Sequence, residues 1–382
     1  MIKILTIVGA RPQFIKASAI SREINRNYSK SISEKILHTG QHYDENMSSV
    51  FFREMEIPEP SYNLEVGSGK HGKQTAEMLA GIESIIVKEN PNVVIVYGDT
   101  NSTLAGALAA SKIHVPLVHI EAGLRSANKR MPEEINRIFT DHVSTLLFSP
   151  TDKGIENLGR EGFQLDSKPP YHIDNPGIFR CGDIMYDNAL YFSKISEERI
   201  CLVNKLKLKK DSYILLTLHR DMNTDIPERL NSIFRAVHEI SRKHEINFVI
   251  PLHPRTNKKW AELPDDTLKD IINNNRLITI IPAVSYLDFL CLEKYARLIM
   301  TDSGGVQKES YFFEKPCIIL REETEWVELV DIGTSLLCGA DQKKIEQGYS
   351  DLIRKKDLHF PEIYGDGHAA RFILDKIVRY IG

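Results

Sequence analysis

The sequence predicts an α/β protein built from two doubly wound parallel sheets that face a cleft. The chain has 382 residues, more than a single hydrophobic core usually spans, so two domains are expected. Short β-branched runs alternate with segments of helical periodicity along the chain. Runs that are apolar on both faces are typical of parallel strands covered by helices on each side.

The predicted strands are spaced so that most intervals leave room for a helix, as crossovers between parallel strands require. They are 4–8, 35–38, 93–97, 117–120, 146–148, 214–218, 248–251, 277–281, 298–300 and 317–320. Helical periodicity is clearest over 17–24 and 77–87, and the second segment ends before Asn90 and Pro91.

The stretch 166–180 interrupts this alternation. It contains Pro169, Pro170 and Pro176 among polar residues, a composition typical of a loop or linker. We therefore expect an N-terminal domain over 1–172 and a C-terminal domain over 173–365. Glycines at the end of the second domain precede a final amphipathic helix, 366–382.

Composition narrows the function classes. The formal net charge is -3 and 26% of residues are charged, so neither nucleic acid nor a membrane surface is an expected partner. The apolar run near the N-terminus is too short for a signal peptide or a spanning helix. The five cysteines are widely spaced and form no C-x-x-C pair, which favours reduced core side chains in the cytoplasm over a zinc site or a disulfide framework.

In doubly wound sheets, ligands bind in the crevice outside the carboxyl ends of the strands. Charged and titratable residues follow many of the predicted strands at that end. They are Arg11 with Lys16, Asp99, Glu121, His219, His253 and Asp302. We interpret His219 and His253 as ligand contacts or proton-transfer groups, because each is followed closely by an arginine at the expected crevice.

The segment that follows the strand 298–300 is typical of an anion site. Ser303, Gly304 and Gly305 lead directly from that strand into a helix. Backbone N–H groups at a helix N-terminus bind phosphate well when no Cβ stands in the way. Glu309, one turn later, is placed to accept from ribose hydroxyls. The alternative is a tight turn, for which two glycines would also serve.

Carboxylates gather in the N-terminal half. Asp99 and Glu121 end neighbouring predicted strands, and close carboxylates push their pKa values apart, leaving one as acid and one as base. Glu133 and Glu134 open the next helix, with Arg137 one turn on. The alternatives are ordinary helix caps and first-turn residues. No metal-ligand spacing and no dinucleotide-binding glycine motif appears, so no cofactor is expected.

Taken together, these motifs resemble the non-hydrolysing UDP-N-acetylglucosamine 2-epimerase family. The matching segments, in family order over almost the whole chain, are 9–12 with Lys16, 97–100, 119–125, 132–137, 302–305 with Gln307 and Glu309, and 364–367. The resemblance implies two Rossmann-like domains arranged as in GT-B glycosyltransferases, with the last helix packed back on the first domain. It also implies a homodimer that needs neither NAD nor metal.

The resemblance further implies roles for individual residues. The catalytic set would be Asp99, Glu121, Glu133 and His219. The substrate-binding set would be Arg11, Lys16, Arg137, His253, Phe289, Ser303, Gly304, Gly305, Glu309 and Arg321, with Phe289 near the uracil and Arg321 facing the diphosphate. The implied reaction is inversion at C2 of a UDP-2-acetamido sugar for surface polysaccharide synthesis. Which carboxylate takes the C2 proton is left open.

Some positions depart from the family pattern. Gln13 stands where well-known members have Glu, Met222 replaces an acidic residue, and Trp326 replaces Arg. Gln13, Trp326 and the short basic loop 126–131 resemble the branch that acts on UDP-2,3-diacetamido-2,3-dideoxy-glucuronate. Both substrates therefore stay open. A hydrolysing epimerase that releases UDP and a GT-B glycosyltransferase are the alternative enzymes, and a catalytically idle sugar-nucleotide sensor is the non-enzyme alternative.

Overall fold

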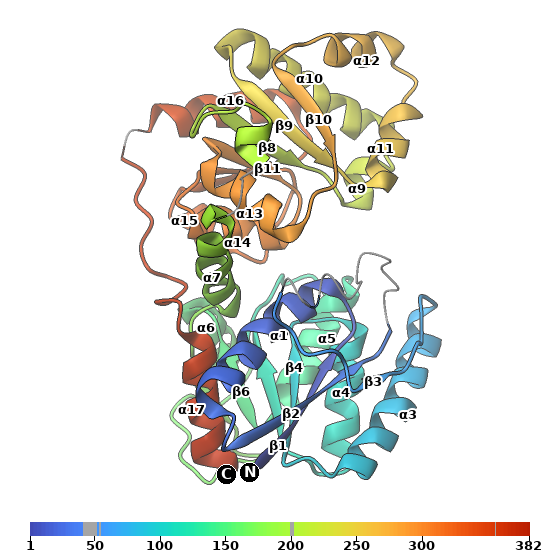
Figure 1. The fold of residues 1–382 in the computed structure, drawn as a ribbon, viewed down its shortest axis with the longest axis vertical. Helices are drawn as coiled ribbons and strands as arrows, with labels where there is room; N and C mark the ends of the chain where they lie inside the picture. Colours follow the sequence, from blue (N-terminus) through green and yellow to red (C-terminus); the bar gives the residue numbers. More distant parts are fainter. Residues whose placement is uncertain (41–51, 53–54, 199–201, 356) are drawn as a thin grey trace. The chain divides into compact units, whose positions relative to one another are not determined.

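The computed structural model describes residues 1–40, 52, 55–198, 202–355 and 357–382 (Figure 1). The chain divides into two compact units, one formed by Met1–Asn188 with Glu362–Gly382 and the other by Ala189–Pro361. Each unit contains one parallel sheet. The α/β class with two parallel sheets is therefore confirmed.

The sheet of the first unit is wound in two directions from its first strand. Its order is β3-β2-β1-β4-β5-β6-β7, and all neighbouring pairs are parallel. The strands are β1 (Ile2–Val8), β2 (Ile32–His38), β3 (Tyr62–Asn63), β4 (Val93–Tyr97), β5 (Leu117–Ile120), β6 (Leu146–Ser149) and β7 (Gly177–Arg180). The order reverses between β1 and β4, so the topological switch point lies at their carboxyl ends.

Helices cover both faces of this sheet. They are α1 (Arg11–Glu23), continued by a π-helical turn (Ile24–Tyr28), α3 (His71–Glu89), α4 (Asn101–Lys112), α5 (Pro132–His142), α6 (Asp152–Arg160) and α17 (Ala369–Ile381). Leu5 and Ile7 of β1 pack in one core cluster with Met78 of α3 and Ala107 of α4. On the other face α1 contacts α17, and Figure 1 shows the two helices side by side.

The second unit repeats the architecture. Its sheet has the order β10-β9-β8-β11-β12-β13, again parallel throughout. The strands are β8 (Tyr213–Thr217), β9 (Asn247–Leu252), β10 (Ile278–Pro282), β11 (Leu298–Thr301), β12 (Cys317–Ile319) and β13 (Ser335–Leu337). The switch point here lies between β8 and β11.

Alternating side chains of β8 supply the two cores of this unit. Ile214 and Leu216 join a cluster with α10 and α16, whereas Tyr213 and Leu215 join a cluster with α13 and α14. This follows from the period of two in a strand that is buried on both faces. The α7 helix (Ile184–Glu198) spans the division between the units. The other helices of the second unit are α8 (Leu202–Lys205), α9 (Asp221–Thr224), α10 (Pro227–His244), α11 (Pro254–Ala261), α12 (Asp266–Asn273), α13 (Tyr286–Tyr295), α14 (Gly304–Phe312), α15 (Val327–Asp331) and α16 (Gln342–Arg354).

One strand lies inside the stretch that the prolines predict to be a linker. β7 pairs with β6, Leu146 opposite Gly177 and Ser149 opposite Arg180. Because β7 is a short edge strand directly after Pro176, its composition resembles that of the loop before it. The boundary between the two compact units comes after Asn188, whereas the sequence predicts a domain boundary after residue 172. The difference arises because β7 belongs to the first sheet.

The cysteines are mostly as expected. Cys181, Cys317 and Cys338 are free. Cys291 is disulfide-bonded, so the expectation of a reduced core thiol is wrong at this position. Cys201 lies outside the described residues. Among the described helices, none is long and apolar enough to cross a membrane.

A buried carboxylate of α7 caps the last helix. Asp187 accepts from the N–H groups of Ala369 at 3.0 Å and Ala370 at 2.8 Å. These two bonds satisfy donors that the first turn of a helix otherwise leaves without partners. Burial raises the pKa of Asp187 to about 6, although the two hydrogen bonds oppose the rise.

We expect Asp187 to lower the stability of the protein as the pH rises from about 4 to about 6. The pKa of an aspartate in an unfolded chain is about 3.9, whereas that of folded Asp187 is about 6. The folded state therefore binds the extra proton within this window and loses that advantage as the carboxyl ionises. A shift of roughly two units corresponds to about 3 kcal/mol of unfolding free energy.

Urea unfolding across this pH window measures the effect. The Asp187→Asn variant cannot ionise at this position, so its unfolding free energy should decline less with pH than that of the unmodified protein. Equal declines in the two proteins would contradict the assignment.

Candidate active site

The candidate residues of the first unit lie at the switch point of its sheet. Arg11 is the first residue of α1, which begins after a short turn that follows β1. Lys16, one turn further along α1, forms an ion pair with Glu121, which follows β5. Glu121 is buried, and Lys16 is 15% exposed. The sheet thus brings a cation from one strand end to a carboxylate from another.

Gly98 lets the turn that carries Asp99 approach Glu121 closely. Its φ is +62°, a conformation that favours glycine. A Cβ at this position would lie 3.1 Å from Oε2 of Glu121 and 3.3 Å from Nζ of Lys16. The N–H of Gly98 donates to the carbonyl of Ile120 at 3.0 Å. The ends of β4 and β5, and the turns that carry Asp99 and Glu121, are therefore neighbours.

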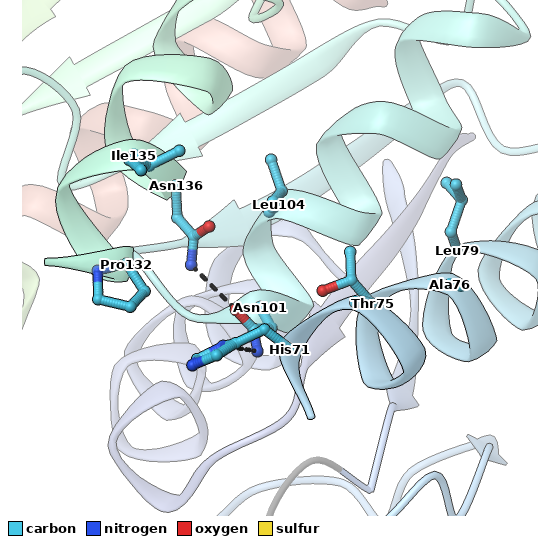
Figure 2. A pocket seen from close by; sticks show the side chains of 10 residues that line it. His71, Thr75, Ala76, Leu79, Asn101, Leu104, Pro132, Ile135 and Asn136 are labelled. Atoms are coloured by element: carbon cyan, nitrogen blue, oxygen red, sulfur yellow. Dashed lines mark hydrogen bonds between the residues drawn. The ribbon is translucent and has the colours of Figure 1, made fainter. Parts of the chain in front are cut away.

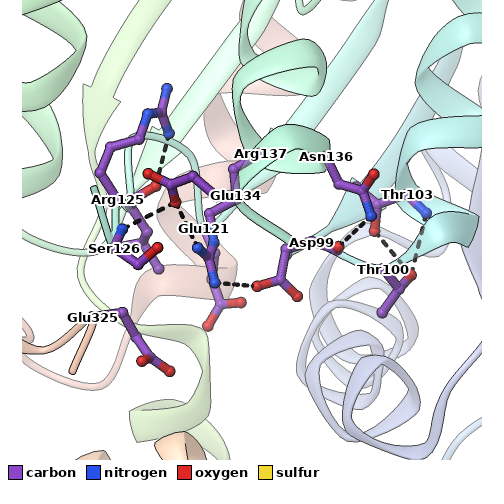
Figure 3. A network of polar contacts seen from close by, with 12 residues as sticks. Asp99, Thr100, Thr103, Glu121, Arg125, Ser126, Glu134, Asn136, Arg137 and Glu325 are labelled. Atoms are coloured by element: carbon purple, nitrogen blue, oxygen red, sulfur yellow. Dashed lines mark hydrogen bonds and ion pairs between the residues drawn. The ribbon is translucent and has the colours of Figure 1, made fainter. Parts of the chain in front are cut away.

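Arg137 joins Asp99 to a second carboxylate (Figure 3). Its Nη2 lies 2.5 Å from Oδ2 of Asp99, and its Nη1 lies 2.8 Å from Oε2 of Glu134. Glu134 also accepts from the N–H groups of Ser126 and Ala127, each at 3.0 Å. Burial raises the pKa of Glu134, but the bonds from Ser126 and Arg137 outweigh it and hold the pKa below its usual value.

A pocket lies beside this network, between α3, α4 and α5 (Figure 2). It is lined by His71, Gly72, Thr75, Ala76, Leu79, Asn101, Leu104, Pro132, Ile135 and Asn136. Asn136 donates to the carbonyl of Asp99 at 2.8 Å, and Asn101 lies 3.0 Å from Nδ1 of His71. None of the lining residues carries a carboxylate. The pocket therefore supports the backbone of Asp99 and contains none of the predicted catalytic groups.

In the second unit, the predicted anion site is the start of α14. Ser303 is the N-cap, and Gly304 and Gly305 are the first helical residues. The carboxylate of Glu325 lies against Gly304, where a Cβ would stand, and its other oxygen is 2.9 Å from Nη1 of Arg321. A helix N-terminus attracts anions. In this structure the Glu325 carboxylate lies beside the first residue of the helix.

A buried aspartate fixes the turn that carries His219. Asp302 accepts from the backbone N–H groups of His219 at 3.0 Å and Arg220 at 3.2 Å. The His219 side chain is 49% exposed, with Nδ1 3.8 Å from Oδ1 of Asp302. His253 is different, because it is the N-cap of α11 and its Nδ1 accepts from the N–H of Arg255 at 3.3 Å.

Glu309 faces away from solvent on α14. It is 4% exposed and accepts from the hydroxyl of Tyr286 at 3.0 Å. Burial raises the pKa of Glu293 well above its usual value, and the neighbouring Glu309 raises it further. Phe289 of α13 packs against the same core cluster as Val306 of α14. The predicted ribose and uracil contacts therefore lie on two helices that pack together.

Comparisons with known proteins decide the family. Residues 23–378 match the family model described as UDP-N-acetylglucosamine 2-epimerase. The chain belongs to this family. It is 47% identical over 383 residues, 99% of each chain, to the UDP-2,3-diacetamido-2,3-dideoxy-D-glucuronate 2-epimerase of Pseudomonas aeruginosa. It is 49% identical over 349 residues, 91% of this chain and 92% of the other, to a UDP-N-acetylglucosamine 2-epimerase homolog of Methanococcus maripaludis.

Solved structures agree with the family assignment. The UDP-GlcNAc 2-epimerase of Methanocaldococcus jannaschii, in complex with UDP-GlcNAc and UDP, matches with a TM-score of 0.85 and 41% identity over 99% of this chain and 100% of that chain. The UDP-GlcNAc 2-epimerase of Neisseria meningitidis, bound to UDP-GlcNAc, matches with a TM-score of 0.83 and 28% identity over 99% and 100%. The resemblance drawn from the sequence motifs is confirmed.

The structure shows that two neighbouring glutamates of α5 have different surroundings. Glu133 is exposed in the first turn of α5, and no described residue forms an ion pair or hydrogen bond with its side chain. Glu134 is buried and bonds Arg137. The spacing i, i+3, i+7 of Glu134, Arg137 and Asp141 places them on one buried face of the helix, a pattern visible in the sequence.

Other polar residues of the site were not singled out from the sequence. Asn136 holds the backbone of Asp99, and His119 with Asp141 lies beneath the same turn, fully buried. His119 and Asn136 lie inside the matching segments 119–125 and 132–137, but the sequence did not show what they contact, because their partners are far away in the chain. Within the described parts of the chain, no group of three or more His, Cys, Asp or Glu is arranged to hold a metal ion.

Glu134→Gln should lower the unfolding free energy by about 1–3 kcal/mol, the usual cost of leaving a buried donor without an acceptor. The amide keeps one acceptor oxygen, whereas Glu134 accepts from two backbone N–H groups and from Arg137. The matched control is Glu133→Gln, one residue away and exposed, which should change stability by less than about 0.5 kcal/mol. Chemical denaturation measures both, and similar losses would count against the role given to Glu134.

Proposed function

We propose that the protein inverts C2 of a UDP-2-acetamido sugar without net hydrolysis, by eliminating UDP and adding it back. The observation that carries this proposal is the pair of carboxylates on neighbouring turns, each with its own cation: Glu121 with Lys16 and Asp99 with Arg137. Two carboxylates at one sheet edge suit a reaction that needs a base and an acid on opposite faces of the sugar.

The second unit would bind the nucleotide. The start of α14, with Ser303, Gly304 and Gly305, offers backbone N–H groups to a diphosphate, and Arg321 adds positive charge nearby. Glu309 would accept from the ribose, with Phe289 near the uracil and His253 among the binding groups. The relatives from M. jannaschii and N. meningitidis, whose structures hold UDP-GlcNAc, support this part of the proposal.

The chemistry proceeds in two steps. A carboxylate takes the C2 proton while the bond between C1 and the diphosphate oxygen breaks, and UDP leaves with the electron pair. The sugar becomes a 2-acetamidoglucal with a double bond between C1 and C2. The diphosphate oxygen then attacks C1, and a proton is delivered to C2 on the opposite face. Arg11, Lys16, Arg137 and His219 would stabilise the charge that develops on the leaving diphosphate.

Two substrates remain candidates, UDP-GlcNAc and the 2,3-diacetamido-glucuronate nucleotide. The side chain of Gln13 does not distinguish the two nucleotides by contacting the sugar, because its amide is already hydrogen-bonded within the protein. Its Oε1 accepts from Gly9 and Ala10 at 2.8 and 3.2 Å, and its Nε2 donates to Tyr97 and Thr103, both at 2.9 Å. Gln13 is buried and joins the turn after β1 to β4 and α4.

The basic loop is a better candidate for reading a uronate carboxylate, because Lys129 and Arg130 are exposed. The 47% identity to the P. aeruginosa uronate epimerase supports this substrate, and 43% identity to a UDP-N-acetylglucosamine 2-epimerase of M. maripaludis supports the other. The proposal includes a cytoplasmic homodimer that serves surface polysaccharide synthesis.

Proton NMR in D2O, with both nucleotides in parallel, tests the reaction and the substrate together. We expect conversion to the manno epimer with deuterium at C2, because the added proton comes from solvent. The preferred nucleotide identifies the branch. Free UDP accumulating with a reducing sugar would instead show a hydrolysing epimerase. No change of either nucleotide would refute the epimerase proposal and favour a transferase or a binding protein.

Gly305→Ala tests the nucleotide site separately. Apart from its chain neighbours and the backbone of its own helix, a Cβ at Gly305 would meet only Oγ of Ser303, at 3.9 Å, so the fold accommodates it. Alanine also favours helix by about 1 kcal/mol over glycine. The added methyl would meet a phosphate at the start of α14, so we expect UDP affinity to fall at least roughly tenfold, about 1.4 kcal/mol, while thermal stability is kept. Calorimetry measures the affinity, and unchanged UDP binding would exclude this helix terminus as the diphosphate site.

A further inference from the structure

Asp141, at the end of α5, is a buried carboxylate to which the proposed reaction gives no role. Its Oδ1 lies 2.6 Å from Nδ1 of His119. Its Oδ2 accepts from the N–H of Gly123 at 3.1 Å and lies 2.8 Å from Nη2 of Arg125. Burial raises the pKa of Asp141, but His119 and Arg125 outweigh it and hold the pKa below its usual value. The carboxylate is therefore ionised and gathers three donors.

His119 connects this carboxylate to the turn that carries Asp99. Its Nε2 lies 2.8 Å from the carbonyl oxygen of Gly98. A carbonyl oxygen only accepts, so Nε2 donates to Gly98 while Nδ1 donates to Asp141. The fully buried ring thus ties the backbone directly before Asp99 to α5.

The same carboxylate closes the turn that carries Glu121. Glu121 has a φ of +73°, which is unfavourable for a residue with a Cβ, and its N–H donates to the carbonyl of Phe148 at 3.1 Å. Gly123 has a φ of +79° and packs directly against the carbonyl of Gly154. The bond from Gly123 to Asp141 holds the far side of this turn, so the strained conformation is maintained from both sides.

We propose that Asp141 is a positioning residue that sets the spacing of the Asp99 and Glu121 carboxylates. It acts through His119 on one turn and through Gly123 on the other, and it contacts no substrate itself. The role rests on the proposed function of the two carboxylates in proton transfer.

Asp141→Asn is the first test. The amide has the same size, but one of its two terminal atoms is a donor, so it cannot accept from His119, Gly123 and Arg125 together. A displacement of the reacting groups by about 1 Å costs on the order of 100-fold in rate. We therefore expect kcat to fall by about that factor with KM nearly unchanged. A larger isotope effect with substrate deuterated at C2 is also expected, because proton transfer becomes slower relative to the other steps.

Asp187→Asn is the matched control. Asp187 is also a buried carboxylate of the first unit that accepts backbone N–H groups, but it caps α17 rather than the two turns. Its kcat and isotope effect should equal those of the unmodified protein. His119→Gln is the second variant, for the case in which Asp141→Asn does not fold. It removes the ring that links Asp141 to Gly98, and kcat should again fall while KM is kept.

The outcomes separate the inference from the proposed function. The positioning role alone would be overturned if the unmodified protein epimerises its substrate and Asp141→Asn has the same kcat and isotope effect. If Asp141→Asn does not fold, the same result in His119→Gln would overturn the role. Equal kinetic losses in the Asp187→Asn control would also overturn it, because they would show general destabilisation. An unmodified protein that epimerises neither nucleotide would overturn the proposed function and this role with it.

Discussion

Burial of both faces of a parallel sheet is the constraint on which the candidate site depends. β4 and β5 are buried along their whole length, and the carboxylates Asp99 and Glu121 come only where these strands stop. His119, inside β5, is also polar, but each of its ring nitrogens has a hydrogen-bond partner. Because the sheet is wound in two directions, the connections that follow the two strands at the switch point leave in opposite directions. Sheets of this type bind ligands in the crevice between those connections. The second sheet obeys the same rule, with His219 after β8 and Ser303 after β11.

Charges in the first unit are arranged as partners rather than as isolated groups. α5 provides the frame, because one of its faces holds Glu134 against the loop, Arg137 against Asp99, and Asp141 beneath the two turns. Buried charges are costly unless they are paired and hydrogen-bonded. The cost is offset here by partners for each carboxylate: Glu134 has two backbone donors and Arg137, Asp141 has one backbone donor with His119 and Arg125, and Asp99 has Arg137.

The start of α14 shows how a helix terminus and its surroundings act together. Gly304 and Gly305 are the first helical residues, and the ion pair between Glu325 and Arg321 lies beside Gly304. The partial positive charge of the helix attracts an anion to this terminus, whether the anion belongs to a side chain or to a ligand.

The sequence alone determined the fold class, most of the strands and the family. Apolar runs, β-branching and glycine at strand ends are local properties, and their order along the chain is preserved in the motifs. It did not reveal β7, because a short edge strand beside Pro176 differs little in composition from a loop. Nor did it distinguish Glu133 from Glu134, since both are acidic first-turn residues and only the packing of α5 buries one of them. The tertiary structure alone decided that His119 and Asp141 join two turns, because their contacts connect residues 18 to 22 positions apart across different elements. Local sequence carries no record of such contacts, which exist only once the sheet has brought the strand ends together.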